Sequence, residues 1–225
     1  MSEHGELQGE FVEVFLSGDS EAASARARQV IDEGVVSAVH FFEGVFSPAM
    51  EIIGGKFGRL EIFLPELMDA ADMAKGVSEN VIQPRLIEAT GVGVPTHGTV
   101  LLASVRGDLH DIGKNMVALM LQVNGFGVID MGVDVGSRVI LDRAVEVKAD
   151  IIGLSALMTT STPYMKEVVD MLKGLGLKDR FAVIVGGAPL TPAFAREIGA
   201  DAYGKNAPDA VAQCLALMDR PKPAR

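Results

Sequence analysis

The chain has 225 residues, of which 48% are hydrophobic and 22% charged, a composition that excludes a disordered protein and allows one to two domains. The formal net charge of −10 disfavours binding to nucleic-acid phosphates, so no nucleic-acid partner is expected. The single cysteine, Cys214, excludes an internal disulfide and a zinc or iron–sulfur site built from cysteine pairs. The first residues lack a signal-peptide pattern and glycines interrupt the apolar stretches, so we expect a cytoplasmic protein without a membrane span.

The first part of the chain has apolar residues at helical spacing. Capping residues and prolines indicate helix starts at Asp19-Ser20, Ser47-Pro48 and Leu64-Pro65. The apolar stripes of these helices are predicted at Ala22, Ala25, Val30, Ile31, Met50, Ile53, Phe57, Leu67, Met68 and Ala71. We therefore predict an all-α helical bundle as a first domain, residues 1–91.

The spacing of apolar residues changes after a segment rich in Gly, Thr and Pro, residues 89–99, which we interpret as a linker. Five short apolar runs follow, at 99–105, 126–132, 150–157, 181–188 and 200–204. A helical stretch follows each run, which is the alternation of a parallel sheet covered on both faces. Residues 92–225 are therefore predicted to form an α/β Rossmann-like (flavodoxin-like) domain with a five-stranded parallel sheet. Its ligand is expected at the carboxyl ends of the strands.

The turn after the first predicted strand contains Asp108, His110 and Gly113 in the order Asp-x-His-x-x-Gly. It is neither a dinucleotide-binding nor a phosphate-binding loop, because it lacks the required glycines. A neutral imidazole suits a borderline transition metal, and Asp108 could orient the second ring nitrogen. The alternative is that His110 and Asp108 only pair at a surface turn. The neighbouring Lys114 is predicted to be an exposed helix lysine.

This Asp-x-His-x-x-Gly pattern resembles the signature of cobalamin-binding domains. The resemblance implies that His110 displaces the benzimidazole base of the cofactor and becomes the lower ligand of cobalt. It also implies that Asp108 tunes this histidine, and that Gly113 leaves room for the displaced nucleotide tail.

Three later segments extend the resemblance. It implies that Ser155 and Leu157, after the third predicted strand, line the channel of the nucleotide tail, and that Thr159 belongs to the same cofactor-binding segment. Ser161 matches a serine that hydrogen-bonds the motif aspartate in methionine synthase; from the residues alone it would be a helix cap. Gly186-Gly187 is like the family's turn beside the buried benzimidazole, although Gly-Gly makes tight turns in many proteins.

The helical part resembles the small cap domain of methionine synthase and of corrinoid methyl carriers, through the segment Gly54–Leu67. The resemblance implies that Phe57 and Leu64 cover the methyl face of the corrin and exclude solvent. The alternative is that both are ordinary bundle core.

The leading hypothesis from this resemblance is a corrinoid protein that holds cobalamin or a related corrinoid and alternates between methylcob(III)alamin and cob(I)alamin. Its partners would be a substrate:corrinoid methyltransferase, a corrinoid:tetrahydrofolate or corrinoid:thiol methyltransferase, and a reductive activation protein. The protein itself would not break bonds. A cobalamin-dependent sensor is the first alternative, although light-sensing members carry a cap Trp that this chain lacks. A small subunit of an adenosylcobalamin mutase is the second.

Overall fold

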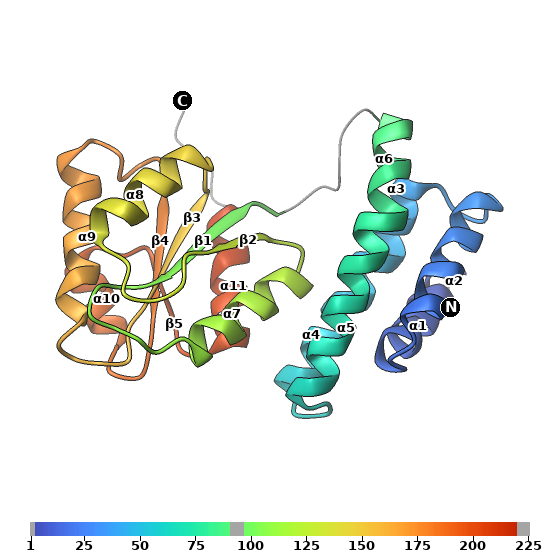
Figure 1. Ribbon diagram of the computed structural model, residues 1–225, viewed down its shortest axis with the longest axis horizontal. Coiled ribbons are helices and arrows are strands. Elements are labelled where there is room, and N and C mark those ends of the chain that lie inside the picture. The colour runs from blue at the N-terminus through green and yellow to red at the C-terminus, as the bar shows by residue number, and fades with distance from the viewer. Residues whose placement is uncertain (1–2, 91–96, 220–225) are drawn as a thin grey trace. The chain divides into compact units, whose positions relative to one another are not determined.

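The computed structural model describes residues 3–90 and 97–219; residues 91–96, which fall within the predicted linker, lie outside this description. The chain divides into two compact units, one of helices and one of a sheet with its covering helices (Figure 1). No helix in the described ranges is long and apolar enough to cross a membrane.

The N-terminal unit is entirely helical, as the sequence predicts. Its elements are α1 (Glu3–Leu16), α2 (Ser20–Asp32), α3 (Ala38–Phe41), η1 (Phe42–Phe46), α4 (Ser47–Gly58), α5 (Leu64–Val77), η2 (Ser78–Ile82) and α6 (Gln83–Thr90). Aromatic rings form much of its interior, because Phe11, Phe15 and Phe41 are fully buried. Phe11 meets Phe41 edge-on, with the ring centroids 5.0 Å apart.

The stripe predicted on α2 is partly wrong, because Val30 is buried as expected but the two predicted alanines are not. Asp19 caps this helix as expected, since its carboxylate accepts the backbone N–H of Ala22 at 2.9 Å. Ala22 and Ala25 are nevertheless exposed, whereas Ala23 and Ala27 are buried together with Val30. Alanines occur on several sides of this helix, so their spacing alone did not identify the buried side.

Two prolines follow π-helical segments in the helical unit. Pro48 lies two residues after η1, and Pro84 lies two residues after η2. Ser47 therefore does not cap α4 as predicted, because the residues before it are already helical. Proline lacks the N–H that would bond the carbonyl four residues earlier. For Pro48 that carbonyl belongs to Gly44, and it accepts the side-chain amide of Gln8 at 2.6 Å.

The C-terminal unit is a five-stranded parallel sheet with helices on both faces, which confirms the predicted α/β class. Its strands are β1 (Thr99–Ser104), β2 (Gly127–Asp130), β3 (Ile151–Ser155), β4 (Ala182–Gly186) and β5 (Ala202–Gly204), in the spatial order β2-β1-β3-β4-β5. Its helices are α7 (Ile112–Val123), α8 (Ser137–Glu146), α9 (Thr162–Gly174), α10 (Pro192–Ile198) and α11 (Ala207–Met218). Figure 1 shows α7 and α11 on one face, and α8 and α9 on the other.

The order of the strands determines where a site can form. The chain leaves β1 toward β2 on one side, and β3 then pairs with the other side of β1. The connections that leave the carboxyl ends of β1 and β3 therefore diverge to opposite faces, and such a switch point is where open α/β sheets bind ligands. The Asp108–Gly113 turn follows β1, and the Leu157–Ser161 segment follows β3.

Candidate functional site

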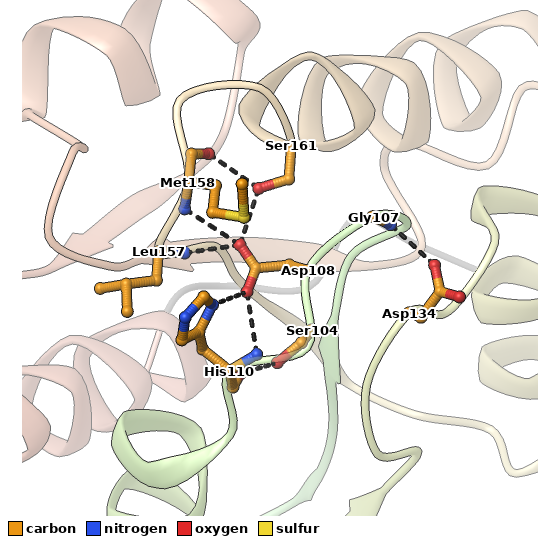
Figure 2. A network of polar contacts seen from close by, with 8 residues as sticks. All are labelled: Ser104, Gly107, Asp108, His110, Asp134, Leu157, Met158 and Ser161. Carbon is orange, nitrogen blue, oxygen red and sulfur yellow. Dashed lines mark hydrogen bonds and ion pairs between the residues drawn. The ribbon is translucent and has the colours of Figure 1, made fainter.

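Asp108 is the centre of a hydrogen-bond network at the ends of β1 and β3 (Figure 2). Its side chain is fully buried. Oδ1 accepts the backbone N–H of His110 at 3.1 Å and the ring Nδ1 of the same residue at 2.9 Å. Oδ2 accepts the backbone N–H groups of Leu157 at 2.7 Å and Met158 at 3.1 Å, and the hydroxyl of Ser161 at 2.7 Å. Five donors therefore converge on one carboxylate.

These contacts determine the charge of Asp108. Burial by itself would raise its pKa, because the charged form loses its water. Hydrogen bonds donated by Ser161, by the backbone of Met158 and by His110 lower the pKa and outweigh burial, so the pKa of Asp108 is held well below its usual range. The buried group is therefore an ionised carboxylate at neutral pH.

An ionised carboxylate fixes the orientation and the tautomer of His110. A carboxylate can only accept hydrogen bonds, so the proton of the neutral ring lies on Nδ1 and Nε2 retains a lone pair. The side chain of His110 is 51% exposed, and its backbone carbonyl accepts the hydroxyl of the buried Ser104 at 2.7 Å. The ring is thus oriented from within the fold while part of it faces outward. This is more than a pair at a surface turn.

Ser161 stands at the N-terminal boundary of α9, but its side chain does not cap the helix. The hydroxyl lies 2.7 Å from Oδ2 of Asp108 and also 2.7 Å from the backbone carbonyl of Met158. The structure therefore brings Asp108, His110 and Ser161 together, as the resemblance implied. Their roles toward a cofactor stay predictions.

The loop after β2 forms hydrogen bonds with the turn that contains Asp108. Asp134 has a left-handed backbone conformation, with φ of 52°. Its carboxylate accepts the backbone N–H of Gly107 at 2.7 Å, and its own N–H donates to the carbonyl of Asp108 at 2.9 Å. No sequence pattern indicates this link, because it depends on a contact between residues 27 positions apart in the chain.

A cavity of about 420 Å³ lies in the sheet unit, between the sheet and helices α7 and α11. Four of the predicted cofactor-binding residues line it: Gly113, Ser155, Gly186 and Gly187. Leu157 and Thr159 do not line it; both are exposed, Leu157 by 47%. The volume is in the range of pockets that hold small ligands, about 300–1,000 Å³.

At two of the glycines in the cavity wall, Gly187 and Gly204, a side chain would not fit. In register, Gly186 pairs with Ser155 on β3 and with Gly204 on β5. A Cβ at Gly204 would come within 2.9 Å of the Cβ of Ala210, and one at Gly187 within 1.8 Å of the carbonyl oxygen of Ala156. Gly187 also has φ of 138°, a conformation that favours glycine.

The burial of Lys114 differs from the sequence prediction. This residue was predicted to be an exposed helix lysine, yet it is buried, lines the cavity and forms an ion pair with Asp130 at the end of β2. Its ammonium also donates to the side chain of Asn115 at 2.8 Å. A buried ammonium requires such partners, because burying an unpaired charge is costly. The partner is 16 residues away in sequence, where no local pattern shows it.

The two predicted cap residues lie in the helical unit, on either side of the α4–α5 turn. Phe57 is half-buried near the end of α4, and Leu64 is 38% exposed at the start of α5. In the same turn, Leu60 is 82% exposed and Phe63 is 75% exposed. Phe57 and Leu64 are therefore only partly covered by the bundle, and the turn carries an apolar surface.

The donor set bears on the kind of metal that the sheet unit could receive. Within residues 3–90 and 97–219, no group of three or more His, Cys, Asp or Glu side chains could hold a metal ion. A single oriented imidazole therefore suits a metal that arrives with its own in-plane ligands. A cavity wide enough for a small organic group lies in the same unit. Both features fit a corrinoid whose nucleotide tail is displaced from cobalt.

The fold and the site together define an α/β protein with one oriented, partly exposed imidazole and a ligand-sized cavity in the same unit. Comparison with known families agrees, because residues 98–212 match the B12 binding domain and residues 7–81 match a second family, also described as B12 binding domain. The chain therefore belongs to the B12-binding corrinoid proteins, and it binds cobalamin or a related corrinoid.

Curated relatives and solved structures narrow the class further. Dimethylamine corrinoid protein 3 of Methanosarcina mazei is 46% identical over 75% of this chain and 99% of its own length. Trimethylamine corrinoid protein of Methanosarcina barkeri is 36% identical over 97% of this chain and 100% of its own length. The methanol:cobalamin methyltransferase complex MtaBC of M. barkeri superposes with a TM-score of 0.83, at 28% identity, over 96% of this chain and 81% of that chain.

A cobalamin-binding protein from Desulfitobacterium hafniense also superposes, with a TM-score of 0.69, at 30% identity, over 93% of this chain and 98% of that chain. These relatives support a methyl-carrying corrinoid protein of a methyltransferase system.

Proposed function

We propose that this chain carries a methyl group on the cobalt of its corrinoid from one methyltransferase to a second. The observation that carries the proposal is the fully buried Asp108 carboxylate, which fixes the His110 imidazole with the lone pair of Nε2 available as a ligand. The first methyltransferase takes the methyl group from a substrate. The second passes it to tetrahydrofolate or to a thiol, and a reductive activation protein restores the carrier after oxidation.

In this proposal the sheet unit provides the residues that bind the cobalt and the nucleotide tail of the cofactor. Nε2 of His110 is the cobalt ligand, while Asp108 and Ser161 set the proton position and the basicity of the ring. Gly113 and Ser155 line the cavity that takes the nucleotide tail. When bound, the corrinoid supplies a cobalt that accepts and donates methyl groups, which no amino-acid side chain does equally well.

The helical unit is the cap in this proposal, and residues 1–91 and 92–225 are the two domains. The apolar surface formed by Phe57, Leu60, Phe63 and Leu64 is suited to cover an apolar face of a macrocycle. The cap has to move aside for each methyltransferase. The cytoplasmic location inferred from the sequence stays a prediction.

The first test of the proposal is an absorption spectrum after anaerobic incubation with hydroxocobalamin and desalting. We expect one retained corrinoid per chain, and a change in its axial-ligand bands in the His110→Ala variant. His40→Ala is the matched control, because His40 is an exposed histidine in the helical unit. A chain that retains no corrinoid contradicts the proposal. An unchanged spectrum in the His110→Ala variant contradicts the role of His110 as the ligand.

The cap is tested separately, by photolysis of the chain loaded with methylcobalamin in air. We expect Phe57→Ala and Leu64→Ala to accelerate the loss of methyl–cobalt absorbance several-fold. Ile52→Ala is the control, since Ile52 is 39% exposed on the same helix as Phe57 and is not predicted to cover the cofactor. Equal rates in all variants would show that Phe57 and Leu64 are only bundle core.

A further inference from the structure

The chemistry of the cavity wall indicates which corrinoids the chain prefers. Apolar side chains from both the sheet and the helices line it, namely Leu102, Val117, Leu121, Ile184, Ala210 and Cys214. Leu121 and Cys214 are fully buried even without a ligand. Where side chains are missing, the wall is the backbone of glycines such as Gly153 and Gly204. A flat apolar ring is the kind of group that packs against such a surface.

Two polar side chains of the cavity wall, Lys114 and Asn206, already have protein partners. The ammonium of Lys114 bonds to Asp130, and the side-chain oxygen of Asn206 accepts the backbone N–H of Asp209 at 2.9 Å. Across the described parts of the chain, no buried side-chain nitrogen or oxygen lacks a hydrogen-bond partner. The fully buried part of the wall therefore has no unsatisfied side-chain group for a polar ring edge, and the other polar side chains of the lining include Ser155 and the exposed Lys205.

The burial of Cys214 supports the same conclusion. Desolvation raises the pKa of its thiol to about 12, so the group is a neutral, weakly polar part of the wall. Ser155 offers a hydroxyl, which can serve the imidazole nitrogen that every purine and benzimidazole base has in common. Neither residue can satisfy several additional nitrogens on one ring.

We propose that this cavity selects corrinoids whose lower base is a benzimidazole over corrinoids whose lower base is a purine. This inference rests on the proposed function, because it assigns the nucleotide tail to the cavity. The two bases have the same five-membered ring. In the six-membered ring, benzimidazole has only carbon atoms, whereas adenine has two nitrogens and an exocyclic amine. In an apolar wall those three groups lose their water without gaining partners.

The expected size of the preference follows from how apolar pockets treat added polar groups. A hydrophobic pocket rejects an isosteric ligand that carries one extra hydroxyl by about 10²-fold. The open side of the cavity lets water reach part of the ring, which reduces this discrimination. We therefore expect cobalamin to bind about 10- to 100-fold more tightly than its adenine analogue.

The experiment compares three probes on the full chain, with dissociation constants measured by absorption titration under anaerobic conditions. The probes are cobalamin, its adenine-based analogue and cobinamide, which lacks the nucleotide tail. Cobinamide separates binding of the corrin ring from binding of the tail. We expect cobalamin to bind more tightly than the adenine analogue. We also expect cobalamin to bind more tightly than cobinamide.

A matched pair of variants tests whether the cavity wall is responsible. Val117 lines the cavity and is only half-buried, so the fold tolerates its replacement. We expect Val117→Asn to narrow the preference for cobalamin at least 3-fold, because its amide supplies donors and an acceptor. Val117→Ala should weaken both complete corrinoids equally and leave their ratio unchanged.

The outcomes separate this inference from the proposed function. If cobalamin and the adenine analogue bind equally, or the adenine analogue binds more tightly, the base preference is overturned while corrinoid binding stands. If Val117→Asn leaves the ratio unchanged, the assignment of the preference to this cavity is overturned. If none of the three probes is retained, the proposed function fails and the preference fails with it.

Discussion

Replacing Asp108 by asparagine tests the network that orients His110. The amide keeps the shape of the carboxylate but converts one acceptor oxygen into a donor. Oδ2 receives three donors and Oδ1 receives two, both from His110. We therefore expect the amide oxygen to take the position of Oδ2 and the NH₂ group to face His110. The ring then moves its proton to Nε2, because Nδ1 must accept.

The cost of this substitution can be worked out from the contacts. The backbone N–H of His110 loses its acceptor, which costs about 1 kcal/mol, the lower end of the range for a buried donor, because this hydrogen bond is only partly buried. The three donors at the other oxygen exchange a charged acceptor for a neutral one, which weakens each bond by about 0.5–1 kcal/mol. Removing the buried charge recovers part of this, because the amide has a smaller desolvation cost. We expect a net loss of about 2–4 kcal/mol in the free energy of unfolding.

The assays are urea unfolding of the cofactor-free chain, followed by circular dichroism, and the hydroxocobalamin spectrum. The control is Asp111→Asn, the same chemical change at an exposed residue next to His110. In the spectrum, Asp108→Asn should resemble His110→Ala, since a protonated Nε2 cannot bind cobalt. A loss below about 0.5 kcal/mol, in the range of ordinary surface substitutions, with wild-type axial-ligand bands would refute this account of the network.

The pH dependence of the same variant provides a further check. The pKa of Asp108 is lower in the folded chain than its unfolded value of about 3.9. The carboxylate therefore contributes stability that is fully present above that value and is lost as the pH falls below it. The stability difference between the wild type and Asp108→Asn should be constant from pH 7 to about pH 5 and shrink toward pH 3. A difference that stays constant down to pH 3 would contradict the lowered pKa.

Three more predictions concern the sheet unit. Gly187→Ala should cost more than about 3 kcal/mol in thermal unfolding, because the new Cβ would overlap a backbone oxygen. Gly113→Ala is the control: Gly113 lies in α7 and a Cβ there meets nothing, so alanine should leave stability unchanged or raise it by up to about 1 kcal/mol. Asp130→Ala should cost about 2–3 kcal/mol by leaving a buried ammonium unpaired, and Lys114→Met under about 1 kcal/mol; equal losses would contradict the burial argument. The raised pKa of Cys214 predicts stability that is complete below about pH 9 and falls toward pH 12, and Cys214→Ala should lose this alkaline dependence.

The periodicity of the sequence was sufficient to predict the structural class of both units. It was not sufficient to predict which face of every helix is buried. Each of the five apolar runs contains one of the five strands, and each strand ends at a glycine or a polar residue within its run. On α2, Val30 was placed correctly but Ala22 and Ala25 were not, because alanine fits both buried and exposed positions and Ala22 and Ala23 look equivalent in the sequence. Among the larger side chains, Ile53 and Leu67 were placed correctly in the core, whereas Met68, also predicted on a buried stripe, is 49% exposed.

The candidate site was predictable where the chemistry lies in side chains at a short spacing. Asp108 and His110 are two residues apart, so their contact follows from a single turn. The backbone donors from Leu157 and Met158 have no sequence signature, because every residue has an N–H group. The ion pair of Lys114 with Asp130 and the link from Asp134 to Gly107 depend on how the loops of neighbouring strands meet.

The π-helical turns before Pro48 and Pro84 have a consequence for how the helical unit tolerates insertions and deletions. A π turn contains one residue more than an α turn, so it is equivalent to a single-residue insertion that the helix has absorbed. Each residue advances an α-helix by about 100°. The apolar pattern of the sequence before η1 and the pattern after it are therefore offset by about 100° around the helix axis. Removing one residue from Phe42–Phe46 together with Pro48→Ala should restore a regular helix and preserve the buried face of α4. The same deletion within α4 would rotate Phe57 away from its present direction.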